Sequence, residues 1–486
     1  MRSARFFAAL LCAGSALAVQ ARDDLTPLLA AARSGDHTAA IALVREGAPV
    51  DAVEADGTTA LHWAAHFGDA ELVRALLAAG ADATAANRYG MTPLQAAAVD
   101  GDAAVLEALI AAGADVNAVL PEGETVLMTA ARTGFSDALR VLLAHGAQME
   151  ARDAFHGESA LIWAAAEDHA DAIEVLAAHG ADVDGRSALM EFPQRRAGQS
   201  ILPLGSWTPL MYAARENALA AAEALIAAGA DLDQVDPDGA TALVIAIINA
   251  HYELAELLLR AGADPNVVDH EAGMGPLYAA VDMHRLAVGH GRGNPVPVGL
   301  LDAVDVVRLL LEHGADPNAM LKKPILQRQH TFGDSTLAAG ATPLLRAAKS
   351  GDIELVRVLL AAGADPALTL PNGSTALMLA AGLGWRNGSP LAPSYDQGSE
   401  EEAVQTLELL LSLGLDLHAA NQTGDTALHA AIAGRGSEPI VRFLLERGAD
   451  PLAVNARQQT PLSIAEARST EAMAALVRAA APAARD

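Results

Sequence analysis

The sequence predicts an all-α solenoid assembled from repeated helix-turn-helix units, and three observations support this fold class. A segment of about 33 residues recurs along the chain. Each copy contains two short blocks in which apolar residues recur at the spacing of an amphipathic helix. A glycine usually follows the second block, where a helix would end. Neither helix of such a pair buries its apolar face alone, so each unit needs neighbouring copies.

The clearest unit is 59–87, with the sequence TALHWAAHFGDAELVRALLAAGADATAAN. Thr59 is a good N-cap for the first helix, and Gly68 and Asp69 separate the two apolar blocks. Gly80 suits the left-handed residue that follows the second helix. Small alanines allow the two helices to pack closely. The unit therefore predicts two short antiparallel helices followed by a turn.

Twelve copies of this unit are marked by Thr-x-Leu or a close variant at their start. They begin near Thr26, Thr59, Thr92, Thr125, Ser159, Thr208, Thr241, Gly275, Thr342, Thr375, Thr426 and Thr460. With the Ala-Ala pair and the LLxxGAD ending, the pattern resembles the ankyrin repeat family. The resemblance implies an ankyrin-repeat solenoid with β-hairpin finger loops, which we expect to form one array over 22–486. The segments AIINAHYELAELLLRAGADPN and LYAAVDMH are also similar to a subgroup of exported bacterial ankyrin repeat proteins.

The first 21 residues have the features of a secretory signal peptide. Arg2 and Arg5 precede an apolar core, and small residues follow at sites suited to cleavage. We expect a mature chain that begins near Val19 or Arg22 and is periplasmic or secreted. The single cysteine, Cys12, would leave with the peptide.

The charge of the chain limits its partners. Removing the two signal-peptide arginines leaves 30 basic against 60 acidic residues, a formal charge of −30. Such a surface repels phosphate backbones, which excludes nucleic acid as a partner. No stretch after the signal peptide is continuously apolar enough to span a membrane. We expect a monomer that binds another protein.

Four insertions interrupt the second half of the array. Two of them, 185–207 and 321–341, follow a second helix, where ankyrin repeats carry their fingers, and are therefore enlarged fingers. The other two, 284–299 and 383–402, lie between the two helices of a repeat. We expect this second pair to project from the end opposite the fingers, and long loops of this kind are often functional.

The two enlarged fingers reverse the sign of the acidic array, since each has a net charge of +2. The positive charges of the first finger are Arg186, Arg195 and Arg196. Those of the second are Lys322, Lys323 and Arg328, with His330 beside them. The fingers would together clamp an acidic partner; the alternative is that these side chains pair with the acidic surface of the array itself.

Aromatic residues in turns, fingers and inserts are further candidates for partner binding, because exposed aromatics often anchor interfaces. They are Phe67, Tyr89, Phe155, Trp207, Trp385 and Tyr395. Each singly would equally pin its own loop. Arg215 follows an Ala-Ala pair, a position that partners of ankyrin arrays usually meet. Trp63 and Trp163 lie within first helices, and we expect them in the core.

No pattern of catalytic or metal-binding residues has a standard spacing. His62 and His429 occupy the fourth position of TALH, where the family uses the imidazole to bond backbone groups. Asp282, His284 and His290 offer oxygen and nitrogen ligands, but they match no metal motif. The Gly-Asp-Ser within 332–337 lacks the strand-to-helix turn of the esterases that use such a block. We therefore expect no catalytic residue, no bound metal and no cofactor.

The sequence as a whole indicates an exported, non-enzymatic scaffold that binds a partner protein through its concave groove and enlarged fingers. Two other classes of function remain open. One is a structural accessory or chaperone for an exported enzyme. The other is an enzymatic or metal-dependent activity within the four inserts, which requires converging catalytic residues.

Overall fold

The computed structural model describes residues 25–190, 205–270, 272–285, 295–323, 336–337, 339–384, 398–468 and 470–481. These residues group into two compact units, which divide between Asp182 and Val183. Within each unit, short helices follow one another in antiparallel pairs, as the sequence predicts. No helix among the described residues has the length and apolar character needed to cross a membrane.

The described residues of unit 1 form five helix pairs, one for each of the first five repeats. Their helices are α2 (Pro27–Ser34), α3 (His37–Arg45), α4 (Ala60–His66), α5 (Ala70–Ala78), α6 (Pro93–Asp100), α7 (Ala103–Ala111), α8 (Val126–Thr133), α9 (Ser136–Ala144), α10 (Ala160–Ala166) and α11 (Ala170–Ala178).

Unit 2 continues the pattern, with longer connections at the four insertions. Its helices are α12 (Pro209–Glu216), α13 (Leu219–Ala227), α14 (Ala242–Ile248), α15 (Tyr252–Ala261), α16 (Pro276–His284), α17 (Ala303–Glu312), α18 (Pro343–Ser350), α19 (Ile353–Ala361), α20 (Ala376–Ala381), α21 (Glu400–Ser412), α22 (Ala427–Ala430) with the π-helical turn η1 (Ala431–Arg435), α23 (Glu438–Glu446), α24 (Pro461–Arg468) and α25 (Glu471–Ala480).

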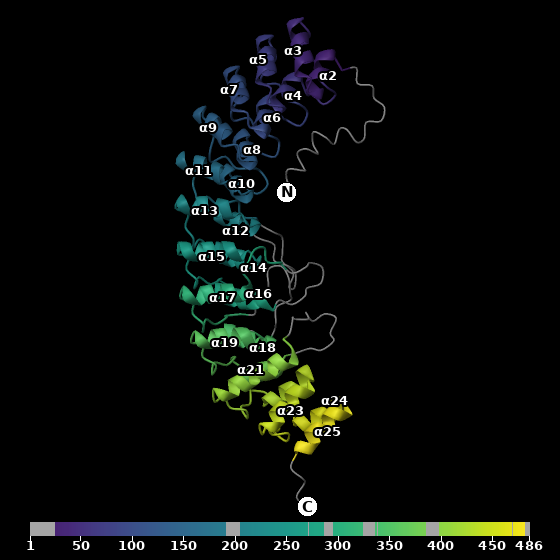
Figure 1. Ribbon diagram of the computed structural model, residues 1–486, viewed down its shortest axis with the longest axis vertical. Helices are drawn as coiled ribbons and strands as arrows, with labels where there is room; N and C mark the ends of the chain where they lie inside the picture. Colours follow the sequence, from purple (N-terminus) through teal and green to yellow (C-terminus); the bar gives the residue numbers. More distant parts are fainter. Residues whose placement is uncertain are drawn as a thin grey trace, which may run out of the picture. The chain divides into compact units, whose positions relative to one another are not determined.

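Each unit has two layers of helices. In unit 1 the first helices α4, α6, α8 and α10 pack in one row, and the second helices α5, α7, α9 and α11 pack in another (Figure 1). Unit 2 is layered in the same way, and α12, α14, α16, α18 and α20 form its first row. The core lies between the rows, where leucines such as Leu61, Leu76 and Leu94 are almost fully buried. Each repeat thus buries its apolar face only against its neighbours.

The threonine that starts a repeat holds the first helix in place. The Thr59 hydroxyl accepts from the His62 backbone N–H at 3.3 Å, and the Thr59 N–H donates to His62 Nδ1 at 3.2 Å. The other ring nitrogen of His62 lies 3.0 Å from the Met91 carbonyl oxygen of the next repeat. His429 makes the equivalent contacts in unit 2. Both histidines are therefore structural, as the sequence predicts.

Every described second helix except α25 is followed by a glycine with positive φ. Gly80 has φ +94°, and a Cβ added there would meet no atom within 4 Å. Space is available, but the left-handed conformation is costly for any residue with a side chain. This conformation lets the Ala81 N–H donate back to the Leu76 carbonyl at 3.0 Å, which ends the helix.

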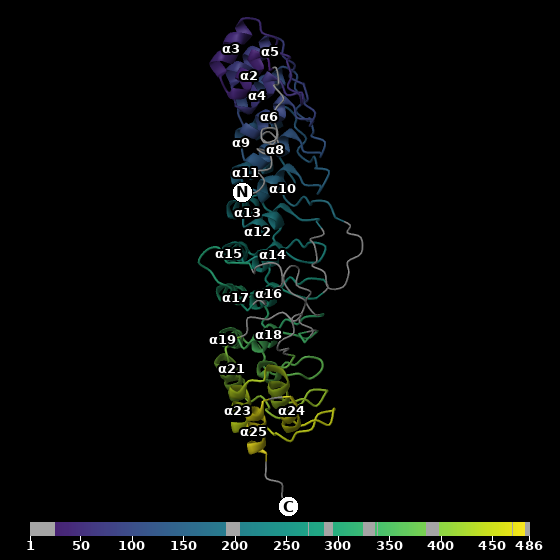
Figure 2. The same cartoon turned by 90° about the vertical axis from the view of Figure 1, so that its right-hand side faces the viewer.

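The loops that join successive repeats lie side by side along one edge of unit 1 (Figure 2). Neighbouring loops are joined by single backbone hydrogen bonds, such as Arg88 N–H to the Asp56 carbonyl at 2.8 Å. The described residues contain isolated β-bridges but no strand. Among the described residues, the hairpin character of the fingers is limited to single bridges, and most of the two enlarged fingers lies outside these residues.

The enlarged fingers are closed at their bases in the manner of a hairpin. In the first, the Ser187 N–H donates to the Trp207 carbonyl at 3.0 Å, and the Ser206 N–H donates to the Ala188 carbonyl at 2.9 Å. In the second, the Leu321 N–H donates to the Ala341 carbonyl at 3.0 Å.

All four insertions lie where the sequence places them, two after a second helix and two between the helices of a pair. One contact joins a finger insert to an inter-helix insert. Thr336, near the end of the second finger, lies so close to Gly384 that a Cβ on that glycine would overlap it. Gly384 is the second residue of the insert 383–402, between α20 and α21. The finger insert and the inter-helix insert, expected at opposite ends of a repeat, are therefore in contact here.

Candidate partner-binding surface

One first helix of unit 1, α4, carries an aromatic cluster that we call the α4 cluster, formed by Trp63, His66 and Phe67. The Trp63 and Phe67 rings are stacked, with centroids 6.1 Å apart and an interplanar angle of 23°. The His66 ring lies 5.2 Å from Phe67 and edge-on to Trp63. Phe67 is 43% exposed. The cluster therefore presents an aromatic surface to solvent at the C-terminal end of α4.

The orientation of Trp63 is set by a carboxylate from the preceding loop. Its indole N–H donates to Glu54 Oε1 at 2.8 Å, and the other oxygen of Glu54 lies 3.6 Å from an Arg33 nitrogen. Trp63 is half-buried rather than part of the core. The core position predicted for it is wrong, because its helix turns this side chain toward the exposed end of the row.

The next helix brings a carboxylate to the α4 cluster. Asp100, the last residue of α6, lies against Gly68, where a Cβ would overlap the carboxylate. Burial lowers the pKa of His66, and the nearby charge of Asp100 only partly opposes this. Burial likewise raises the pKa of Asp100. His66 is thus neutral at pH 7 and does not neutralise Asp100.

Further along the same row, α8 and α10 contribute an arginine stacked on a tryptophan. The guanidinium of Arg132 lies 5.4 Å from the centre of the Trp163 ring. Its nitrogen is 3.3 Å from Glu124, which is almost fully buried and also accepts from the Thr129 hydroxyl at 2.8 Å. Trp163 is half-buried, so it too differs from the predicted core position, and its indole N–H has no hydrogen-bond partner.

In unit 2 the corresponding arginine is Arg215, whose guanidinium lies over both Trp207 and Tyr212 at 5.4 and 5.2 Å. Trp207 is only 5% exposed, and its indole N–H donates to Asp236 at 3.2 Å. It does not meet the exposure required of an anchor, and it pins the base of the first finger instead. The position of Trp207 in its repeat could have predicted this burial, because the residue just before the start of a repeat is also buried at Thr58 and Glu124.

The remaining aromatic candidates differ in their surroundings. Phe155 is 73% exposed at a loop tip, and Tyr89 is 39% exposed with its hydroxyl 2.6 Å from Arg88. Both remain accessible to a partner. Trp385 and Tyr395 lie outside the described residues.

Most of the predicted basic candidates of the fingers lie outside the described residues, namely Arg195, Arg196, Arg328 and His330. Lys322 and Lys323 are described and exposed. Arg186 is described and donates to the carbonyls of Ser206 and Val235 at 2.9 and 2.8 Å. Arg186 thus stabilises the base of its own finger through backbone acceptors.

A second polar cluster lies at the C-terminal ends of α16 and α18. Asp282 pairs with Arg346 at 2.6 Å, and His284 lies 2.5 Å from Asp352, which is fully buried. Burial lowers the pKa of His284, but the hydrogen bond and charge of Asp352 outweigh it, so the pKa is raised. Two of the three residues considered as metal ligands thus have protein partners, and His290 lies outside the described residues. Among the described residues, no group of three or more side chains is arranged to hold a metal.

This cluster also joins the bases of two insertions. Arg285, the residue after α16, lies 2.8 Å from Glu402 in the first turn of α21. The backbone N–H of Gly398, just before α21, donates to the Ser350 carbonyl at 2.8 Å. Sequence reasoning missed these contacts, because residues 117 and 48 positions apart give no local signal.

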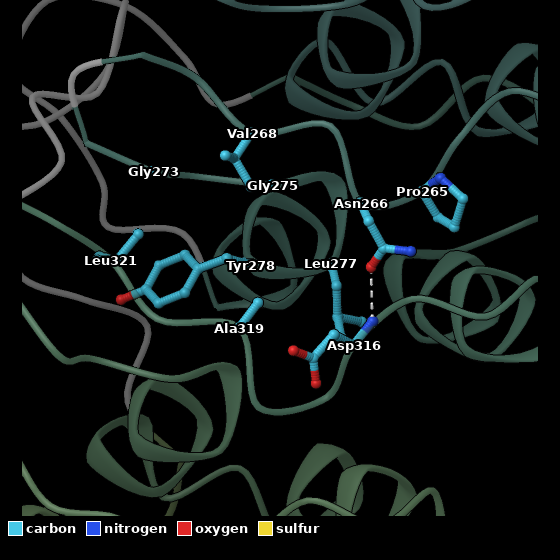
Figure 3. Close-up of a pocket in the computed structure, with 10 residues that line it drawn as sticks. All are labelled: Pro265, Asn266, Val268, Gly273, Gly275, Leu277, Tyr278, Asp316, Ala319 and Leu321. Atoms are coloured by element: carbon cyan, nitrogen blue, oxygen red, sulfur yellow. Dashed lines mark hydrogen bonds between the residues drawn. The ribbon is translucent and has the colours of Figure 1, made fainter.

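A small pocket lies between two neighbouring loops of unit 2 (Figure 3). The Tyr278 ring and Leu321 line one end, and at the other Asn266 Oδ1 accepts from the Asp316 N–H at 2.8 Å. Its volume of about 20 Å³ holds a single water molecule and not a metabolite. The pocket is thus part of the packing between repeats.

Comparison with known protein families gives matches over most of the chain. A family described as "Ankyrin repeats (3 copies)" matches residues 3–87, 28–119, 94–187, 194–269 and 397–486. A second, described as "Ankyrin repeat", matches 273–321 and 339–369.

Curated relatives share parts of their sequence with this chain. It is 31% identical over 211 residues to the B-cell lymphoma 3 protein homolog of Mus musculus, covering 39% of this chain and 42% of the relative. It is 36% identical over 126 residues to ankyrin repeat and SAM domain-containing protein 6 of Mus musculus, covering 26% and 11%. The chain thus spans less than half of either relative. A crystal structure of the human ASB11 ankyrin repeat domain aligns with a TM-score of 0.41 and 26% identity, covering 49% of this chain and 99% of that one.

Proposed function

This chain belongs to the ankyrin repeat family, and from that premise we propose that it is an exported, non-enzymatic scaffold that binds another protein. The family generally mediates protein–protein interaction. The observation that supports a binding role most directly is the exposed α4 cluster. Its Phe67 is 43% exposed and stacked on Trp63, and the exposed Asp100 carboxylate lies against the neighbouring Gly68.

Export is the second part of the proposal, and the signal-peptide features of residues 1–21 support it. An exported scaffold would meet its partner in the periplasm or outside the cell. The basic residues of the two enlarged fingers would then add a second contact, to an acidic part of the partner.

A crosslinking pull-down from native cells tests the binding role, with purified partner then used to measure association. Reversing Arg195, Arg196, Lys322 and Lys323 to Glu is expected to slow association and to reduce its salt dependence. The matched control reverses four arginines on second helices, Arg45, Arg74, Arg140 and Arg260. If the finger variant folds and captures the partner as fast as the control, the fingers are not part of the site.

A further inference from the structure

The α4 cluster has an unbalanced charge. The Asp100 carboxylate is exposed beside Gly68, and no hydrogen bond or ion pair to it is present among the described residues. Its neighbour His66 is held neutral by burial, so the negative charge has no local counter-charge. A carboxylate partly removed from water gains most from a cation that approaches it.

The aromatic rings beside this carboxylate favour the same kind of ligand. Positive charge is attracted to the faces of aromatic rings, most strongly to tryptophan, and the attraction grows when water is excluded. Phe67 is exposed, and it stacks on Trp63, whose N–H is already bonded to Glu54. The exposed ring therefore offers a face and not a hydrogen-bonding group.

The chain itself shows what completes such an arrangement. Four repeats into unit 1, the guanidinium of Arg132 lies over Trp163 and pairs with Glu124. Carboxylate, aromatic ring and guanidinium are all supplied internally there. At the α4 cluster the equivalent arginine of the preceding helix is Arg33 in α2, which pairs with Glu54 at 3.6 Å. Among the described residues, no side chain supplies a cation to Asp100 from the following helix α6.

We propose that the α4 cluster and Asp100 bind an arginine side chain from a basic segment of the partner protein. The guanidinium would stack on Phe67 and pair with Asp100. Arginine fits better than lysine, because its planar group stacks on a ring and donates two parallel hydrogen bonds to a carboxylate. This inference rests on the proposed function and specifies the chemistry of the partner.

The charge of unit 1 agrees with a basic ligand. Residues 25–182 contain 23 acidic and 7 basic residues, a net charge of −16. A basic segment is therefore attracted to the whole unit, but the general attraction does not select a position on it. The α4 cluster supplies the position, because the aromatic stack and the unpaired carboxylate occur together there.

The test uses the full-length protein labelled with 5-fluorotryptophan, whose four tryptophans give separate reporters. The probe is the capped tripeptide Arg-Arg-Arg, and the control is the same peptide with citrulline, which keeps the shape and loses the charge. We expect a saturable shift of the Trp63 ¹⁹F signal with the arginine peptide and none with citrulline. Asp100→Asn and Phe67→Ala should each weaken binding about threefold to tenfold.

Matched variants separate this site from general attraction. Glu71→Gln removes one exposed carboxylate from α5, and Phe155→Ala removes another exposed aromatic. Neither variant should change the affinity for the arginine peptide, reported by Trp63, beyond the small effect of losing one distant charge that is screened by salt. An equal loss in Asp100→Asn and Glu71→Gln, or an equal response to citrulline, would overturn the proposal. If the arginine peptide fails while the protein still captures its partner, only the proposed chemistry is wrong.

Discussion

The buried ion pair between Asp282 and Arg346 allows a quantitative test of the packing between repeats. The two side chains are 11% and 3% exposed, and they join α16 to α18 at 2.6 Å. Replacing Asp282 with Ala leaves the arginine without its carboxylate in the interior. Breaking a buried pair in this way costs about 3 to 5 kcal/mol. Arg346 also donates to the Arg285 carbonyl at 3.1 Å and keeps this bond in the variant. We therefore expect a loss of unfolding free energy at the lower end of the range, about 3 kcal/mol.

An exposed pair in the same unit provides the control. Arg447 and Glu408 are 2.8 Å apart, but both are about half exposed. Glu408→Ala should therefore cost no more than about 1 kcal/mol. Urea unfolding followed by hydrogen exchange measures the loss locally, which matters because a repeat array need not unfold in one step. Equal losses in the two variants would refute the reasoning that burial determines the energy of the pair.

Three further predictions concern pH, local unfolding and processing. Folding raises the pKa of His284, so its pair with Asp352 stabilises the folded protein fully below about pH 6.5, and this stabilisation is lost as the pH rises through the folded-state pKa. The difference in unfolding free energy between wild type and His284→Gln should therefore shrink over that range. A constant difference would contradict the assignment. Leu243→Asp buries an unpaired charge in α14 and should destabilise that region by about 3 kcal/mol or more, while distant repeats keep part of their hydrogen-exchange protection. A uniform loss of protection along the chain would argue against independent units. Mass spectrometry of the exported form should show a mature protein that begins near Val19 or Arg22. An intact Met1 in the soluble cytosolic fraction would contradict this expectation.

Much of the fold could be predicted from the sequence, because each repeat encodes its own helix pair locally. The apolar spacing, the threonine cap and the terminal glycine lie within one copy, so α4 and α5 appear where expected. The extent of pairing in the fingers could not be predicted, since a repeating loop gives no direct measure of how many residues pair, and the described residues show single bridges.

The candidate site was harder to predict, because exposure depends on neighbouring repeats. Trp207 reads as a finger residue, yet Asp236 of the next repeat accepts its N–H and buries it. Trp63 reads as a core residue, yet its ring faces the exposed end of the row. The pairing of Asp282 with Arg346 spans 64 positions and has no local signature.

Site-specific photo-crosslinking tests the central claim, that the aromatic end of the first helices in unit 1 contacts a partner protein. Benzoylphenylalanine would replace Phe67 in the α4 cluster. In a matched control it would replace Arg74 on the second helix α5, because both side chains are exposed. We predict a single partner adduct from position 67 and little or none from position 74. Equal adducts from the two positions, or an adduct from position 74 alone, would contradict the account.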